Sequence, residues 1–247
     1  MRKVALLCAL TVAGALGITA IASAIQGQQG LKVALQNNRA GTKSKPRSVS
    51  KLTVTTSTTI VPGEAPWAAT AATIHFDKNL VFNSSKFPKC SATQVQADNT
   101  KCPKGSKVGS GAAQSTLFSG TAASGNPAPT VTAYNGSNNH LFLLVVNQSP
   151  AVRAVMTGTL KTDTGKYGRK LDIPQIPSVL QNGGFPGLTI SLTQFRTSVG
   201  GTFKGTPFVA LKGCTGGKLS YNSVIKFRDA SGVASQATAA STGTCRK

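Results

Sequence analysis

The sequence predicts an all-β protein, a mainly antiparallel β-sandwich of immunoglobulin-like or jelly-roll-like type with about ten to twelve short strands. Two observations predict this class. Short segments in which apolar and polar residues alternate recur along most of the chain, as expected for half-buried strands. Turn-forming residues separate these segments, and the 26 glycines and 12 prolines would interrupt most helices.

The expected strands begin near Ser48 and continue to the C-terminus. The first is rich in threonine, a residue that favours extended backbone. The segment 229–232 lies between the last two strands and is expected to form a hairpin loop. The strands after the first are expected at 70–76, 107–118, 130–134, 141–147, 152–160, 170–173, 188–198, 208–211, 218–228 and 233–241.

The first 24 residues have the three parts of a secretory signal peptide. Arg2 and Lys3 give a positive start, residues 4–22 are apolar, and Ala-Ser-Ala at 22–24 is a small-residue cleavage pattern. We therefore expect export and cleavage after Ala24. An uncleaved membrane anchor is the alternative, because 19 apolar residues approach the ~20 that cross a bilayer.

Residues 25–47 are expected to form a flexible basic linker, because few of them could pack and their charges are all positive. The alternation of Leu31, Val33 and Leu35 leaves a short strand as the alternative. The composition changes near Ser48, and we expect a single β domain over residues 48–247.

The chain is strongly basic, with 27 Lys and Arg against six Asp and Glu and a formal charge of +21. Loss of the signal peptide would lower this by two, to +19. Such a charge favours anionic partners and opposes self-association, although solubility alone is the simpler explanation. Export and the scarcity of aromatic residues among the charges argue against nucleic acid. Anionic cell-wall polymers or acidic glycans are the expected partners.

The cysteines support export. Cys8 would leave with the signal peptide, and four cysteines would remain, an even number typical of disulfide-bonded exported proteins. Three pairings are possible. Short separation in sequence favours Cys90–Cys102 and Cys214–Cys245. No metal or other cofactor is expected, because the chain has no CxxC motif and only two histidines.

Five lysines bracket the first cysteine pair. A Cys90–Cys102 disulfide would gather them into one loop region, where charge density alone could bind an anion. A solvated loop without a ligand is the simpler alternative. The five candidates are Lys86, Lys89, Lys101, Lys104 and Lys107.

No catalytic residue is predicted. His75 and Asp77 share one face of an expected strand, but Ile74 and Phe76 occupy the opposite, inward face. The two polar side chains should therefore lie at the surface. His140 is expected to be a turn residue. An extracellular hydrolase with an unrecognised active site remains the alternative function.

Four sequence features carry a resemblance to a protein family. They are Phe-Pro-Lys-Cys at 87–90, the segment 102–111 beginning Cys-Pro-Lys-Gly, Cys214 before an alternating hairpin, and Cys245 near the end. The order of these features resembles a family of uncharacterised exported β-sandwich-like proteins of high-GC Gram-positive bacteria. The resemblance covers most of residues 48–247 and implies export, a β fold and the same local disulfides. It implies no catalytic residues, because the family has no assigned activity.

These observations together predict a secreted, non-enzymatic protein of the extracellular space or the cell wall. Its basic surface is expected to bind anionic polymers of the envelope.

Overall fold

The computed structural model describes residues 29–60, 66–177 and 187–247. The expected signal peptide at 1–24 and its cleavage site lie outside the described residues. Within the described ranges, no helix is long and apolar enough to cross a membrane.

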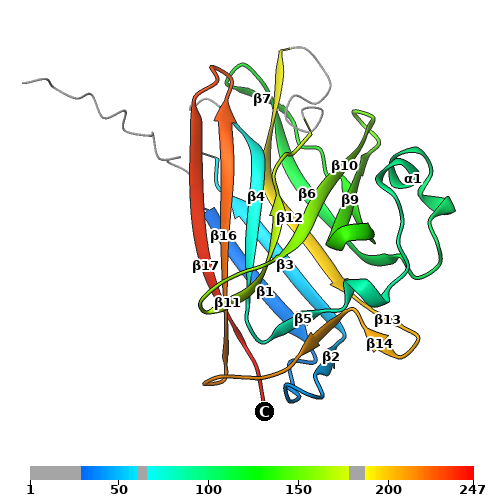
Figure 1. Cartoon of the computed structure of the whole chain (residues 1–247). Helices are drawn as coiled ribbons and strands as arrows, with labels where there is room; N and C mark the ends of the chain where they lie inside the picture. The colour runs from blue at the N-terminus through cyan, green and yellow to red at the C-terminus, as the bar shows by residue number, and fades with distance from the viewer. Residues whose placement is uncertain (1–28, 61–65, 178–186) are drawn as a thin grey trace, which may run out of the picture.

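One large antiparallel sheet of twelve strands dominates the described residues (Figure 1). Eleven of the strands follow one continuous path, and β7 (Ala122–Gly125) pairs with β6 beside it. In order along the path the strands are β1 (Gln29–Gln36), β3 (Lys51–Thr58), β12 (Leu188–Gly200), β6 (Lys107–Ser119), β8 (Thr130–Asn135), β9 (His140–Asn147), β10 (Val152–Thr162), β11 (Tyr167–Ile173), β4 (Trp67–Asp77), β16 (Lys218–Asp229) and β17 (Ala234–Thr244).

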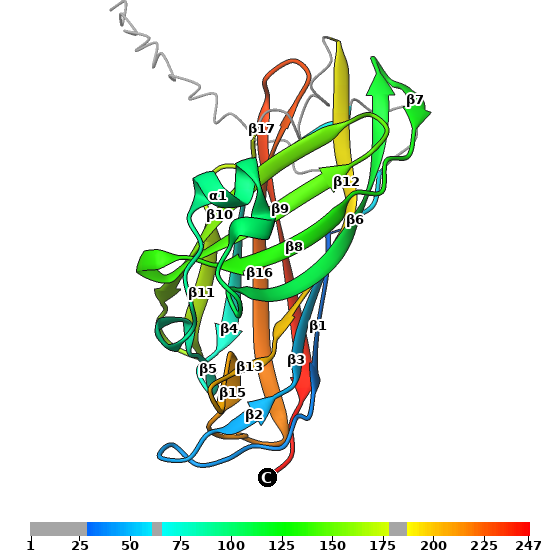
Figure 2. The ribbon, with the colours of Figure 1, turned by 90° about the vertical axis from the view of Figure 1, so that its right-hand side faces the viewer.

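The sheet curls until its first and last strands meet, so it is nearly closed into a barrel (Figures 1 and 2). Every neighbouring pair along the path is antiparallel. Because the path holds an odd number of strands, β1 and β17 run in the same direction. A parallel bridge between Arg39 and Arg246 extends this seam beyond the two strands. The backbone N–H of Arg246 donates to the carbonyl oxygen of Asn38 at 3.0 Å.

The prediction of an all-β, antiparallel fold is confirmed, whereas a sandwich is not. A sandwich needs two large facing sheets, whereas eleven of the described strands follow one curled path and the other described sheets have only two or three short strands. Alternation of apolar and polar residues shows that each strand buries one face. It does not distinguish a second sheet from the far wall of a curled one.

Residues 29–36, expected to be part of the linker, instead form β1, which pairs with β3 along its whole length. Val33 is buried in the core, and Leu31 and Leu35 pack against it. The alternation of these three residues was therefore a genuine strand signal. The folded part of the chain begins before Ser48.

Short strands cover the end of the sheet near the C-terminus, at the bottom of Figures 1 and 2. The fully buried side chains of Val49, Phe208 and Leu211 fill this end. The short strands form a three-stranded sheet, β2 (Arg47–Val49), β15 (Val209–Leu211) and β5 (Leu80–Phe82), and a hairpin, β13 (Thr202–Phe203) and β14 (Thr206–Pro207).

A small helical subregion covers the outer face of β9 and β10 (Figure 2). The Ser91 side chain accepts from the backbone N–H of Gln94, and the Gln94 side chain accepts from that of Ser91, which forms a capping box. A helix of six residues is too short to show helical periodicity in the sequence. The helical elements are η1 (Ser84–Lys86), α1 (Ala92–Ala97), η2 (Asn99–Lys101) and, before β9, η3 (Ser137–Asn139).

Both expected disulfides are present. Cys90 and Cys102 join the two ends of the segment that contains α1 and η2, with a Cα–Cα distance of 5.2 Å. Cys214 and Cys245 join the segment before β16 to the segment after β17, with a Cα–Cα distance of 5.7 Å. Such bonds are typical of proteins that mature in an oxidising compartment.

Candidate functional site

A strongly basic surface lies where the chain leaves β1 and β17. Asn37 has a φ of 62° and turns the chain out of β1, a conformation that asparagine tolerates better than most residues. The backbone N–H of Ala40 then donates to the carbonyl oxygen of Arg246 at 2.6 Å. These contacts place Arg39 beside Arg246, although the two residues lie near opposite ends of the sequence.

The loop between Arg39 and Arg47 folds tightly over the same end of the sheet. The backbone N–H of Gly41 donates to the carbonyl oxygen of Leu211 at 2.9 Å. The backbone N–H of Thr42 donates to the carbonyl oxygen of Lys45 at 3.1 Å. A Cβ at Gly41 would overlap the carbonyl oxygen of Lys45 and lie 2.7 Å from the nitrogen of Arg47. The close approach therefore requires glycine, and it places Arg47 at the start of β2.

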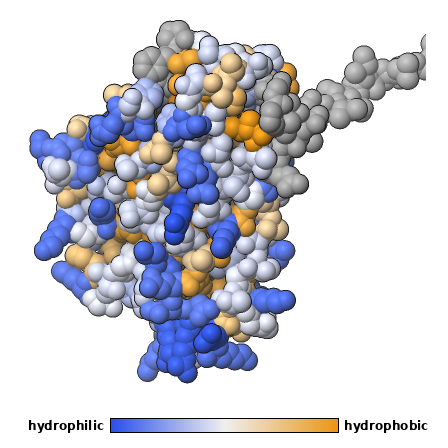
Figure 3. Space-filling view, turned by 180° about the vertical axis from the view of Figure 1, so that it is seen from behind, coloured by the Kyte–Doolittle hydropathy of each residue, from blue (hydrophilic) through white to orange (hydrophobic). Residues whose placement is uncertain are grey.

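Seven residues line a hollow of about 740 Å³ at this end of the molecule. We call this surface the basic end. Figure 3 shows hydrophilic side chains gathered at the corresponding, lower end of the molecule. The residues that line the hollow are Asn37, Asn38, Arg39, Arg47, Ser48, Arg246 and Lys247.

The positive charges of the basic end have no acidic side chain as a partner among the described residues. The four charged side chains that line the hollow are exposed. The ion pairs found in the described ranges join His75 to Asp163, Lys101 to Asp98 and Lys161 to Asp172. Asp77 and Asp229 accept hydrogen bonds in their own local turns. The hollow is therefore lined by four positively charged side chains, and no described aspartate forms an ion pair with any of them. Such a surface attracts anions.

The five lysines proposed from sequence do lie around the Cys90–Cys102 loop, but not all of them are free. Lys89 Nζ donates to the carbonyl oxygen of Ser84, and burial lowers the pKa of Lys89. Lys101 Nζ lies 3.9 Å from Asp98 Oδ2. Lys101 stays exposed in this ion pair, and the three exposed lysines that have no ion pair among the described residues are Lys86, Lys104 and Lys107. Sequence reasoning missed the basic end, because its residues come from segments that only the seam brings together.

His75 forms a contact that the sequence did not predict. It points outward from β4, as expected, and its Nδ1 lies 2.6 Å from Asp163 Oδ2. The ring of Tyr167 packs against it with a centroid distance of 5.3 Å. Burial raises the pKa of Asp163, but hydrogen bonds from His75 and from the backbone of Thr164 outweigh burial, so the pKa is lowered.

Asp77 was expected at the surface beside His75 and is instead buried, with an exposed fraction of 7%. Its Oδ1 accepts from the backbone and side-chain nitrogens of Asn79, both at 2.9 Å. Its Oδ2 accepts from the backbone N–H of Ser220 at 2.8 Å. The β4–β5 turn and the start of β16 cover this carboxylate. Its hydrogen bonds hold these two segments of backbone together, so its role is structural. His140 was expected to be a turn residue and is instead the first residue of β9, directly after η3.

No protein-family model, curated protein or solved structure matches this chain. In the part of the chain that the structure describes, no group of three or more His, Cys, Asp or Glu side chains could hold a metal ion. The functional argument therefore depends on the surfaces and cavities of the molecule itself.

Proposed function

We propose that this protein is an exported, non-enzymatic protein that binds anionic polymers of the cell envelope through the basic end. The observation that carries the proposal is the hollow lined by Arg39, Arg47, Arg246 and Lys247, which no described aspartate neutralises. The signal-peptide pattern and the two disulfides support an extracellular setting.

The chemistry of the basic end suits a chain of repeated anions. An arginine guanidinium can donate two parallel hydrogen bonds to one phosphate or carboxylate group. A single exposed ion pair contributes only about 0–1 kcal/mol, so one isolated anion would bind weakly. A polymer engages several arginines at once, and each further contact forms at high effective concentration. Binding should weaken as salt screens the exposed charges.

The alternative of an extracellular hydrolase would use His75, whose pairing with Asp163 resembles an oriented general base. A base must face a site where substrate can bind. His75 lines neither the hollow of the basic end nor the two interior cavities of the sheet. Binding through the basic end is therefore the better-supported function.

The test compares two triple variants that each remove three positive charges. One is Arg39→Gln, Arg47→Gln and Arg246→Gln at the basic end. The matched control is Lys86→Gln, Lys104→Gln and Lys107→Gln in the Cys90–Cys102 region. Both sets are exposed side chains, so both variants should keep the fold. Binding to polyphosphate, to polygalacturonate and to isolated cell walls is measured over a range of salt concentrations.

We expect the basic-end variant to lose at least about tenfold in affinity at low salt, which corresponds to ~1.4 kcal/mol. The control should lose much less, and the wild-type affinity should fall as salt rises. If the two variants lose the same affinity for the polymers, the basic end is not the binding site. Retention that does not depend on salt would contradict the electrostatic mechanism itself.

A further inference from the structure

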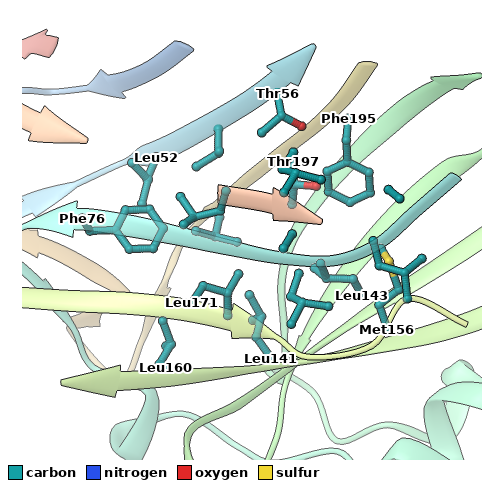
Figure 4. Close-up of a pocket in the computed structure, with 18 of the residues that line it drawn as sticks. Leu52, Thr56, Phe76, Leu141, Leu143, Met156, Leu160, Leu171, Phe195 and Thr197 are labelled. Carbon is teal, nitrogen blue, oxygen red and sulfur yellow. The ribbon is translucent and has the colours of Figure 1, made fainter. Parts of the chain in front are cut away.

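Two neighbouring apolar cavities lie inside the curled sheet. Their volumes are about 90 Å³ and about 60 Å³. Figure 4 shows side chains from strands around the sheet pointing into the larger one. Among the described residues, no charged side chain lines either cavity. The residues that the two cavities share are Ala69, Met156, Ile176, Leu192 and Phe195.

The cavities follow from the width of the sheet and from the small residues on its inner face. Eight strands enclose a space that side chains can just fill, and the diameter grows with strand number. The path here has eleven strands. Ala69 and Ala72 line the larger cavity with short side chains, so the additional width is not filled.

One polar atom in the wall of the larger cavity has no hydrogen-bonding partner in the part of the chain that the structure describes. Thr197 is 9% exposed, and its Oγ1 is buried without a hydrogen bond among the described residues. Its neighbours Phe195 and Val199 on β12 and its cross-strand partner Val54 line the same cavity. Figure 4 shows the hydroxyls of Thr197 and Thr56 in this wall.

An unsatisfied hydroxyl inside an apolar cavity destabilises the folded protein, and it can also form a hydrogen bond to a ligand. Leaving a buried polar group without a partner costs about 1–3 kcal/mol. A ligand that supplies one hydrogen-bonding group would remove this cost. A charged ligand would lose its hydration, and none of the described side chains that line the cavity carries a charge to compensate for this loss. The cavity therefore suits an uncharged ligand.

We propose that the interior of the sheet binds a small, uncharged hydrocarbon that carries one hydroxyl or carbonyl group, with Thr197 Oγ1 as its hydrogen-bonding partner. A dry cavity of roughly 150 Å³ accommodates benzene. Met156 lines both cavities, and its flexible side chain can move to join them into one space of that order. The expected ligand is about as large as a single aromatic ring or a six-carbon chain.

The experiment uses three probes on the whole protein: xenon, 1-hexanol and hexanoate. Xenon binding is followed by 129Xe NMR, and the other two are titrated by calorimetry. Thr197→Val removes the hydroxyl and keeps the shape. Thr55→Val, in the same strand pair but outside the cavity wall, is the matched control. Ala69→Val narrows both cavities, and the melting temperature of every variant checks its folding.

We expect xenon and 1-hexanol to bind the wild type and hexanoate not to bind. Thr197→Val should lower the affinity for 1-hexanol about fivefold to tenfold and leave xenon binding unchanged. Thr55→Val should change neither. If the Ala69→Val variant folds, it should bind both xenon and 1-hexanol more weakly than the wild type.

Two outcomes would overturn the inference. If neither xenon nor 1-hexanol binds, the cavities are packing defects and not a ligand site. If Thr197→Val and Thr55→Val affect 1-hexanol equally, the hydroxyl plays no part in recognition. Polyanion binding by Thr197→Val should match the wild type, which keeps this test independent of the one at the basic end.

Discussion

At the scale of single residues, the His75–Asp163 pair links two parts of the outer surface. His75 belongs to β4, and Asp163 follows β10 in the connection to β11. The exposed fractions of the two side chains are 19% and 11%, so solvent screens their hydrogen bond only in part. The pair therefore holds the β10–β11 connection against β4, and its contribution depends on the ionisation of Asp163.

Asp163→Asn should make the protein less sensitive to acid. Because the pKa of Asp163 is lowered in the folded state, its stabilising effect is fully present above the unfolded value of about 3.9. The effect is lost as the pH falls through the lower, folded-state pKa. Urea denaturation between neutral pH and about pH 2 measures this dependence. The variant should have a flatter profile in the acid range, and profiles parallel to the wild type would exclude a role for the pair.

At the scale of the element, the sequence signal of a strand depends on what covers its two faces. In β9, Leu141 and Leu143 face the interior, while Phe142 and Leu144 pack under the Cys90–Cys102 region. Both faces are apolar, so the strand has a continuous hydrophobic run. In β1 the large apolar side chains all point inward, and Val33 is the most deeply buried of them, whereas the outward face carries Lys32 and the small Ala34. The same fold thus gives one obvious strand and one that resembles a polar linker.

Val33→Ala tests whether β1 belongs to the core in solution. Truncation of a buried valine should lower the free energy of unfolding by about 1–3 kcal/mol, through lost apolar burial and the cavity that remains. Lys32→Ala changes the exposed neighbour on the same strand and should have an effect within about 0.5 kcal/mol. Thermal and urea unfolding give both values. Identical stabilities for the two variants would mean that residues 29–36 do not pack against the sheet.

At the scale of the whole molecule, the sequence predicted features formed by residues that are close along the chain. It did not predict that the sheet curls until its first and last strands meet. The two disulfides join cysteines 12 and 31 positions apart, so short separation in sequence was enough to pair them. The contact of Arg39 with Arg246 depends on the position of every strand between them. The basic end and the interior cavities both depend on this closure. Neither could be inferred from alternation, which reports only how one strand buries its own two faces.

The Cys214–Cys245 disulfide should contribute more to global stability than its local position suggests, because it fixes the segment after β17 beside the seam. Changing both cysteines to serine should lower the free energy of unfolding by about 2–4 kcal/mol. The melting temperature and the urea midpoint provide the measurement, with the Cys90→Ser, Cys102→Ser variant for comparison. A smaller loss in Cys214→Ser, Cys245→Ser than in that variant would contradict a special role for the seam.

The parallel seam has a consequence for the order in which the chain can fold. β1 is the first strand of the path, and the strand that lies along its free edge is the last one, β17. A chain that emerges N-terminus first must therefore keep the edge of β1 unpaired until almost all of its length is available. An exposed strand edge invites pairing with other chains. The positive charges next to this edge, at Lys32 and Arg39, repel a second copy during this interval. The excess of basic residues would then protect the nascent chain from aggregation before it serves the finished protein.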